Sequence, residues 1–214
     1  MNLLLMSMTL SENPIEKFFF ERVGKLPSSI AYIPSKTDPT RKYFEKIKDH
    51  FLKIGVQEIT YCDFDLECSS HSLEILHKSE CVYLSGGMTP YFLAQLQKNN
   101  ILEELIKLAK IGRPIIGVSA GALIMGKNLD ILQDDQDEGD DTREMTNRQG
   151  LGLYNFEFWP HYGSHPNDES RLRTRNFEIG IKIIGCDDLS GLMKVGNKWT
   201  TFGITNVFDS NESK

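Results

Sequence analysis

A serine set among small residues is the first feature of the sequence that could do chemistry. In the stretch IIGVSAGALIMG, residues 115–126, an apolar run ends at Ser119, which lies between Gly117 and Gly121. The pattern G-x-S-x-G is typical of a nucleophile elbow, a sharp strand-to-helix turn whose neighbouring side chains must be small. A helix that starts after the serine adds positive potential and N–H groups at the hydroxyl. The sequence therefore predicts Ser119 as a nucleophile, although a tightly packed turn without catalysis fits the same pattern.

A serine hydroxyl is a weak nucleophile unless a base lies next to it. Of the five histidines, His161 directly follows the apolar run NFEFWP and should project from the end of a strand. Open α/β sheets bind their ligands at the carboxyl ends of their strands. We therefore predict His161 as the general base, with His165 as the second choice.

A second turn of small residues, Ser85-Gly86-Gly87, follows the apolar segment CVYL. Glycines allow backbone N–H groups to approach a ligand closely. One of these N–H groups, together with that of Ala120, could bind the oxyanion that develops during acyl transfer. An ordinary strand-to-helix turn explains the same residues equally well.

The elements that must position these residues alternate along the first two thirds of the chain. Short apolar runs separated by amphipathic segments predict parallel strands joined by helices, and thus a doubly wound, three-layer α/β sheet. The last part, with Gly196-Asn197 at a turn, predicts a closing β-hairpin. Strands are predicted at 3–8, 29–33, 58–64, 81–84, 114–118, 153–159, 191–195 and 199–204, and helices at 15–23, 41–54, 73–78, 91–97, 101–110, 120–125 and 169–180.

The composition is that of a soluble globular protein, with 214 residues, 40% hydrophobic and 25% charged residues. This length suits one domain, predicted at 1–208, followed by a polar tail at 209–214. The net charge of −6 argues against non-specific electrostatic binding to nucleic acid or anionic membranes. The four cysteines match no zinc spacing, and the short apolar start matches no signal peptide, so we expect a cytoplasmic protein.

In the order and sequence of these motifs, the chain resembles the dipeptidase E and cyanophycinase family of serine peptidases. The resemblance rests on VYLSGGMTPYFLAQL (82–96), RPIIGVSAGALIM (113–125) and GLGLYNFEFWPHYG (150–163), and it spans about residues 3–204. It implies a flavodoxin-like fold of the class I glutamine-amidotransferase type. It also implies Ser119 as nucleophile, His161 as base, and an oxyanion hole formed by the N–H groups of Gly87 and Ala120.

The acid of the triad is the point at which the sequence departs from the family. The resemblance implies an aspartate after the elbow helix, which corresponds to Asp134, with Asp135 as the close alternative. The stretch DILQDDQDEGDD, residues 130–141, contains seven acidic residues among twelve, so the assignment could shift by a few positions. A solvated loop of like charges is the competing interpretation of this acidic run.

The resemblance implies hydrolysis of small peptides, including dipeptides with N-terminal aspartate, without a metal or other cofactor. Arg171 is the candidate for the substrate carboxylate, because a guanidinium can bind it in bidentate fashion; a solvated helix face is the alternative. Cyanophycinase-like activity, another hydrolase activity on the same triad, and a catalytically silent binding module stay open. We expect a monomer or homodimer whose partner is a small peptide, with no nucleic acid or membrane partner.

Overall fold

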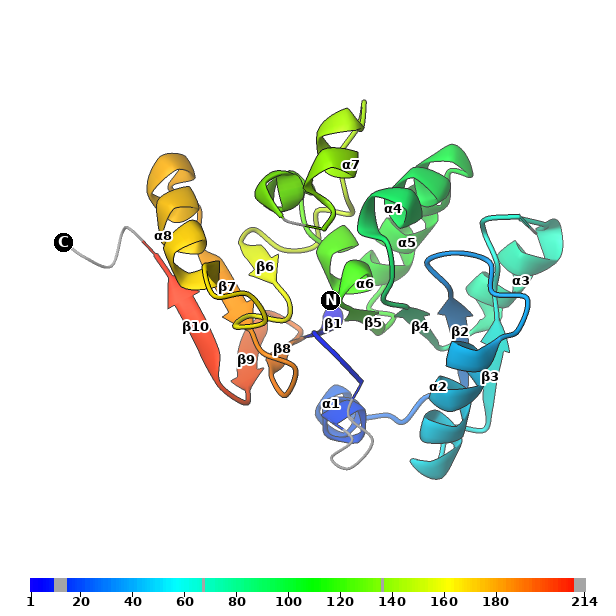
Figure 1. The fold of residues 1–214 in the computed structure, drawn as a ribbon. Coiled ribbons are helices and arrows are strands. Elements are labelled where there is room, and N and C mark those ends of the chain that lie inside the picture. Colours follow the sequence, from blue (N-terminus) through cyan, green and yellow to red (C-terminus); the bar gives the residue numbers. More distant parts are fainter. Residues whose placement is uncertain (10–14, 67, 136, 210–214) are drawn as a thin grey trace.

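A seven-stranded, mostly parallel sheet forms the centre of the computed structural model, which describes residues 1–9, 15–66, 68–135 and 137–209, without the side chains of Asp134 and Asp140 (Figure 1). The strand order is β3-β2-β4-β5-β1-β8-β9. The first five strands in this order run parallel to one another. Strand β8 pairs antiparallel with β1, and β9 pairs antiparallel with β8. The strands are β1 (Asn2–Met6), β2 (Ser29–Ile33), β3 (Glu58–Tyr61), β4 (Cys81–Leu84), β5 (Ile115–Val118), β8 (Gly191–Val195) and β9 (Lys198–Phe202).

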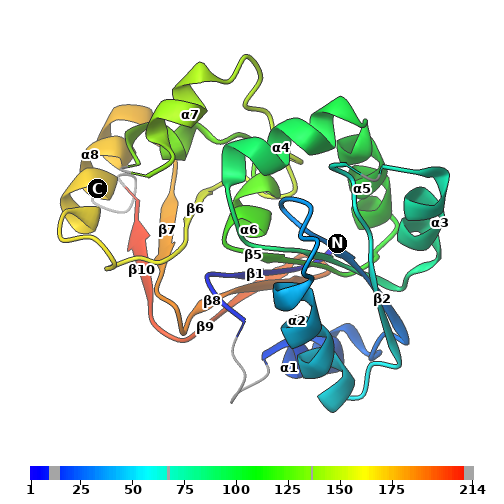
Figure 2. The same ribbon diagram turned by 45° about the vertical axis from the view of Figure 1, so that its right-hand side comes forward.

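Helices cover both faces of this sheet, which gives the predicted three layers (Figure 2). On one face lie α1 (Ile15–Val23) and α2 (Lys42–Lys53). On the other lie α3 (Ser70–Lys78), α4 (Thr89–Lys98), α5 (Ile101–Lys110) and α6 (Ala120–Ile124). Parallel sheets with helices on both sides are buried on both faces, which explains why their strands are apolar throughout.

The side chains of β1 point alternately to the two faces of the sheet and contribute to a hydrophobic core on each. Leu3 and Leu5 belong to the hydrophobic cluster beneath α3 to α6, whereas Leu4 and Met6 belong to the cluster beneath α1 and α2. Successive side chains of a strand point to opposite faces, so one apolar strand supplies both cores. All four residues are fully buried.

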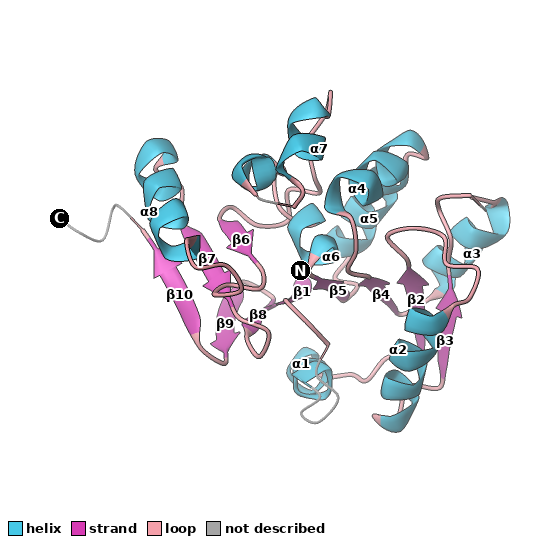
Figure 3. Ribbon diagram, viewed as in Figure 1, coloured by secondary structure: helices cyan, strands magenta, loops and turns pink. Residues whose placement is uncertain are grey.

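A second, three-stranded sheet was not predicted. It consists of β6 (Glu157–Trp159), β7 (Ile183–Cys186) and β10 (Thr205–Phe208), in the order β10-β7-β6, and stands beside the central sheet with α8 (Asp168–Ile179) over it (Figure 3). Strands β6 and β7 pair in parallel, and β10 pairs antiparallel to β7. The predicted hairpin is present as β8 and β9, and the predicted strand 153–159 is shorter, at Glu157–Trp159.

The acidic segment contains two short helical pieces, η1 (Asp130–Asp134) and α7 (Gly139–Glu144), where the sequence predicted only a polar loop. Most of the predicted tail, 210–214, lies outside the described residues. None of the helices in the described ranges is long and apolar enough to span a membrane.

Contact between the elbow and its neighbouring strand yields a test of this packing. A Cβ added to Gly121 would overlap the backbone oxygen of Leu84, whereas one added to Gly86 would meet its nearest neighbour at an ordinary 3.5 Å. We expect Gly121→Ala to lower the free energy of unfolding by at least about 2 kcal/mol, because backbone must shift to make room. Gly86→Ala should cost less than about 1 kcal/mol. Urea denaturation of both variants measures the difference, and equal stabilities would contradict the packing.

Candidate active site

Ser119 occupies the turn between β5 and α6 in a backbone conformation that side chains rarely adopt. Its φ is 49° and its ψ is −111°. The turn is held by the Ser119 N–H, which donates to the oxygen of Met6 at 2.8 Å, and by the Gly121 N–H, which donates to the oxygen of Ser85 at 3.1 Å. A Cβ on Gly117 would lie 2.7 Å from the backbone nitrogen of Ala122. The small residues around Ser119 are therefore required by close approach of strand and helix.

His161 lies within hydrogen-bond distance of this serine. Its Nε2 is 3.0 Å from the Ser119 Oγ. The backbone of His161 has a positive φ of 56°, and its N–H donates to the Ser7 Oγ at 3.1 Å. Ser7 is buried and donates its own hydroxyl to the oxygen of Cys186. The imidazole is thus placed beside the Ser119 hydroxyl by contacts at the carboxyl end of β1.

Asp188 holds the other side of the imidazole. Its Oδ1 is 2.5 Å from the His161 Nδ1. A carboxylate in this position fixes the tautomer in which Nε2 can accept the serine proton, and stabilises the imidazolium that forms. Ser119, His161 and Asp188 therefore form one continuous hydrogen-bonded chain.

The small sheet explains why His161 and Asp188 meet although 27 residues separate them. Strand β6 ends at Trp159, two residues before His161, and β7 ends at Cys186, two residues before Asp188. Because β6 and β7 are parallel neighbours, their carboxyl ends lie at the same edge of the sheet. The backbone N–H of Tyr162 also donates to the oxygen of Cys186 at 2.9 Å, which ties the two strand ends together.

The acid that pairs with His161 is not one of the two predicted from the sequence. Asp135 lines the same cavity as Ser119, but its Oδ1 accepts the N–H groups of Asp137 and Glu138 at 2.9 Å each. Its Oδ2 faces Arg171 at 4.0 Å, so the carboxylate is used in the loop before α7 and not at the imidazole. The side chain of Asp134 lies outside the described residues. Asp135, the predicted alternative, therefore does not pair with the His161 Nδ1; Asp188 does.

A signal for Asp188 exists in the sequence. The segment IIGCDD has the composition of a short buried strand followed by two acids. If that strand had been predicted, Asp187 and Asp188 would have been expected at its carboxyl end, in the same kind of position as His161.

A cavity of about 400 Å³ opens beside the serine. Ser119, His161 and Asp188 line it together with Gly87 and His165. Gly87 has a φ of 142°, and a Cβ there would overlap the Oγ of Ser35, so only glycine fits this turn. Ala120 follows Ser119 as the first residue of α6, where backbone N–H groups have no partner within the helix. The second-choice base, His165, has its Nε2 4.0 Å from the Oδ2 of Asp137.

Glu138 contributes a carboxylate to the wall of this cavity. Its Oε1 accepts the N–H of Thr89, the first residue of α4, at 2.8 Å. Burial raises the pKa of Glu138 above its usual range; the hydrogen bond from Thr89 opposes this rise, and the charges of Asp135 and Asp137 add to it.

Arg171, the predicted ligand of a substrate carboxylate, is engaged by protein groups. Its guanidinium lies over the Trp159 ring, 4.3 Å from the centroid, and its Nη2 is 3.0 Å from Asp168 and 4.0 Å from Asp135. It is not among the residues that line the cavity of Ser119. The structure therefore places Arg171 outside the lining of the cavity, in contact with Trp159 and Asp168.

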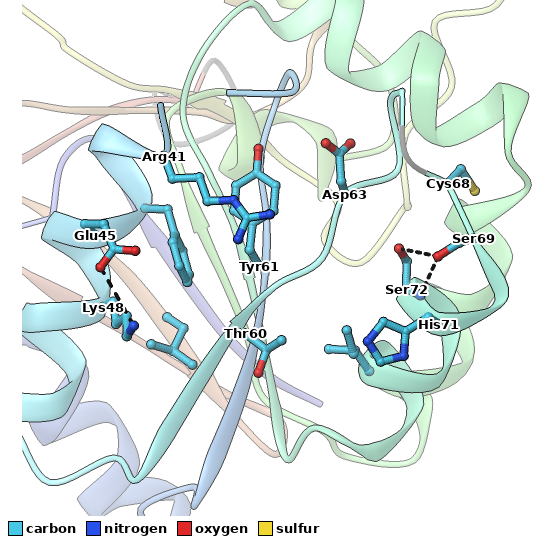
Figure 4. Close-up of a pocket in the computed structure, with 13 residues that line it drawn as sticks. Arg41, Glu45, Lys48, Thr60, Tyr61, Asp63, Cys68, Ser69, His71 and Ser72 are labelled. Carbon is cyan, nitrogen blue, oxygen red and sulfur yellow. Dashed lines mark hydrogen bonds and ion pairs between the residues drawn. The ribbon is translucent and has the colours of Figure 1, made fainter. Parts of the chain in front are cut away.

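A larger cavity, of about 640 Å³, lies at the opposite edge of the central sheet, between α2 and α3 (Figure 4). Arg41, directly before α2, and Lys48 of α2 line it on one side, and His71 of α3 lines it on the other. The hydroxyls of its two serines, Ser69 and Ser72, lie 3.2 Å apart and bond to each other, which is not the arrangement of a serine activated by a histidine. Within the described ranges, no group of three or more His, Cys, Asp or Glu side chains is arranged to hold a metal ion.

The chain is similar to several known peptidases. The model of peptidase family S51 matches residues 3–199. An uncharacterized peptidase of Pasteurella multocida is 31% identical over 157 residues, which cover 69% of this chain and 72% of the relative. A peptidase E of a Nostoc species is 28% identical over 160 residues, which cover 73% of this chain and 62% of the relative.

Solved structures show the same fold. A Listeria monocytogenes protein described as a peptidase E superposes with a TM-score of 0.71 at 22% identity, over 95% of this chain and 98% of that one. A peptidase from an acI-B1 Actinobacterium superposes with a TM-score of 0.69 at 17% identity, over 97% of this chain and 90% of that one.

Reactivity of the serine gives a direct test of the site. A fluorophosphonate probe should label Ser119, because His161 can accept the proton of its hydroxyl. We expect labelling to be lost in Ser119→Ala and to fall by at least about 100-fold in rate in His161→Ala. His165→Ala is the matched control and should keep the rate. Mass spectrometry of the labelled peptide checks the position, and undiminished labelling of Ser119→Ala would show that the nucleophile lies elsewhere.

Proposed function

The chain belongs to peptidase family S51, and we propose that it is a serine peptidase that hydrolyses small peptides through an acyl-enzyme on Ser119. The single observation that carries this proposal is the hydrogen-bonded chain from Ser119 through His161 to Asp188 at the wall of one cavity. A nucleophile, a base and a group that orients the base are the three parts that acyl transfer requires.

In the proposed acylation step, the Ser119 Oγ attacks the peptide carbonyl carbon while its proton passes to the His161 Nε2. The carbonyl oxygen becomes an oxyanion, which the N–H groups of Gly87 and Ala120 stabilise. The imidazolium, stabilised by Asp188, then gives its proton to the leaving amine as the C–N bond breaks. In the second half of the reaction, water attacks the ester carbon as its proton passes to the His161 Nε2. The bond between the acyl carbon and the Ser119 Oγ then breaks as His161 returns the proton to Oγ, and the acid is released.

The size of the cavity favours a small substrate. A volume of about 400 Å³ lies within the range of about 300–1,000 Å³ that is usual for small-ligand sites. Dipeptides with N-terminal aspartate, which the family resemblance implies, would need a cation at this cavity. Since Arg171 is paired with Asp168 behind Trp159, aspartyl dipeptides enter the proposal as members of a test panel and not as the preferred class.

A panel of dipeptides tests the proposed activity. The wild-type protein should release free amino acids from at least one of Asp-X, Glu-X, Ala-X and Lys-X, measured by chromatography. Ser119→Ala should lower this rate by at least about 1,000-fold, because no acyl-enzyme can form. Release of amino acids at equal rates by both proteins would contradict a mechanism through Ser119.

The assignment of the acid has its own test. We expect Asp188→Asn to lower kcat by about 100- to 10,000-fold, because the amide no longer stabilises the imidazolium. Asp135→Asn is the matched control and should change kcat by less than about 10-fold, since Asp135 does not contact His161. Peptide hydrolysis and thermal unfolding of both variants separate a catalytic loss from a loss of folded protein. A larger loss of kcat in Asp135→Asn would reverse the assignment.

A further inference from the structure

Strand β3 lies at one end of the central sheet, and one side of its backbone faces away from the neighbouring strand β2. The N–H groups of Glu58 and Cys62 donate to backbone oxygens in and directly before β2, at 3.0 and 2.8 Å. Successive residues of a strand direct their backbone groups to opposite sides, so the intervening Ile59 and Tyr61 direct theirs to the open side. Unpaired groups of this kind can pair with a further strand.

The cavity of about 640 Å³ lies at this open side of β3 (Figure 4). Ile59 and Tyr61 line it from β3, Phe44 and Lys48 from α2, and Ile75 from α3. Phe44 belongs to the hydrophobic cluster on one face of the sheet, and Ile75 packs against the cluster on the other face. The open side of β3 is therefore the floor of a groove whose walls are α2 and α3, and we call this cavity the edge groove.

The charges at the edge groove favour an anionic occupant. The Arg41 guanidinium lies over the Tyr61 ring, 4.6 Å from its centroid, and pairs with no carboxylate of the described residues. Both oxygens of Asp63, which is buried, accept hydrogen bonds from protein groups at 2.8 Å. The Glu45 carboxylate faces Lys48 at 3.8 Å. The acids of the groove thus have protein partners, whereas a cation beside the open backbone of β3 has only an aromatic ring.

We propose that the edge groove binds an extended, acidic peptide segment of another protein, which pairs with β3 as an additional strand. Hydrogen bonds to the backbone of Ile59 and Tyr61 hold the segment in register. Its alternate side chains point toward α2, where carboxylates meet Arg41 and Lys48.

A second copy of this chain suits the edge groove less well. Pairing of two copies through the same edge would place Arg41 and Lys48 of both chains at one interface, where like charges repel. The proposal is also independent of the proposed function, because neither Ser119 nor His161 lines this groove.

Binding of matched synthetic peptides tests the preference for acidic segments. A short peptide of alternating glutamate and valine, with fluorescein at its amino terminus and an amide at its carboxyl terminus, is compared with one in which lysine replaces glutamate. By fluorescence anisotropy, the acidic peptide should bind the full-length protein at least about 10-fold more tightly, because its carboxylates complement the cations of the groove. Added salt should weaken this binding, since the charges are exposed to solvent.

N-methylation of the acidic peptide tests the pairing with β3. The N–H groups of one alternate set of residues face β3, and those of the other set face away. Methylation of every glutamate nitrogen or of every valine nitrogen removes one set at a time, and the two peptides carry similar numbers of methyl groups. One of them should bind at least about 10-fold more weakly than the unmethylated peptide, and the other should bind within about 3-fold of it. Equal effects of the two methylations would contradict strand addition.

Variants of the protein locate the binding site. Arg41→Gln and Lys48→Gln should each weaken binding of the acidic peptide by about 3- to 10-fold, and together they should remove its advantage over the lysine peptide. Lys46→Gln is the matched control, because Lys46 is an exposed residue of α2 that does not line the groove. Thermal unfolding shows whether each variant is folded.

The remaining outcomes would overturn the proposal. They are no measurable binding of the acidic peptide, equal binding of the two peptides, or equal losses in Lys46→Gln and Arg41→Gln. Sedimentation of the protein alone tests the other occupant. A dimer that dissociates when Arg41 is replaced would mean that a second copy, and not another protein, covers β3.

Discussion

The end of β1 is the fixed point on which the geometry of the site depends. The oxygen of Met6 accepts the N–H of Ser119, and the hydroxyl of Ser7 accepts the N–H of His161 and donates to Cys186. The positions of three segments far apart in sequence are thereby fixed by two consecutive residues, Met6 at the end of β1 and Ser7 directly after it. Hydrogen bonds to buried groups are costly to break, so these contacts restrict the serine and the histidine to a narrow range of relative positions.

Strain at the site is consistent with this constraint. Ser119 and His161 both have positive φ, although neither is glycine. A residue held in such a conformation costs about 1–3 kcal/mol and persists only where the surrounding structure over-determines it. At Ser119 the surroundings are the packed elbow, and at His161 they are the bonds to Ser7 and between Tyr162 and Cys186. Both side chains line the cavity.

The sequence was sufficient for those parts of the site that local sterics determine. The elbow was predictable because close packing of β5 against α6 demands Gly117, and close packing of α6 against Leu84 of β4 demands Gly121. His161 was predictable because a polar residue after an apolar strand lies at a sheet edge. The central sheet was predictable for a similar reason, since apolar strands alternating with helices leave few topologies.

The small sheet and Asp188 were not predictable in the same way, because their signal lies in pairing between distant segments. Strand β7 has only four residues, and a short apolar run can belong to a strand, a helix or a loop. Only its parallel pairing with β6 places Asp188 beside His161. The family resemblance instead points to the acidic stretch after the elbow helix, where composition offers many carboxylates and no means of ranking them.

The division between two sheets has a consequence for how the site is maintained. Ser119 is fixed by the central sheet, whereas His161 and Asp188 are fixed by the small one. The side chain of Asp188 is 54% exposed, so its attraction to the imidazole is screened by water and contributes little to holding the sheets together. Alignment of Ser119 with His161 must therefore come from the buried contacts of Ser7 and from the short connection between β7 and β8 of the central sheet. The hydrogen bonds that join Ser119, His161 and Asp188 are the result of this alignment and not its cause.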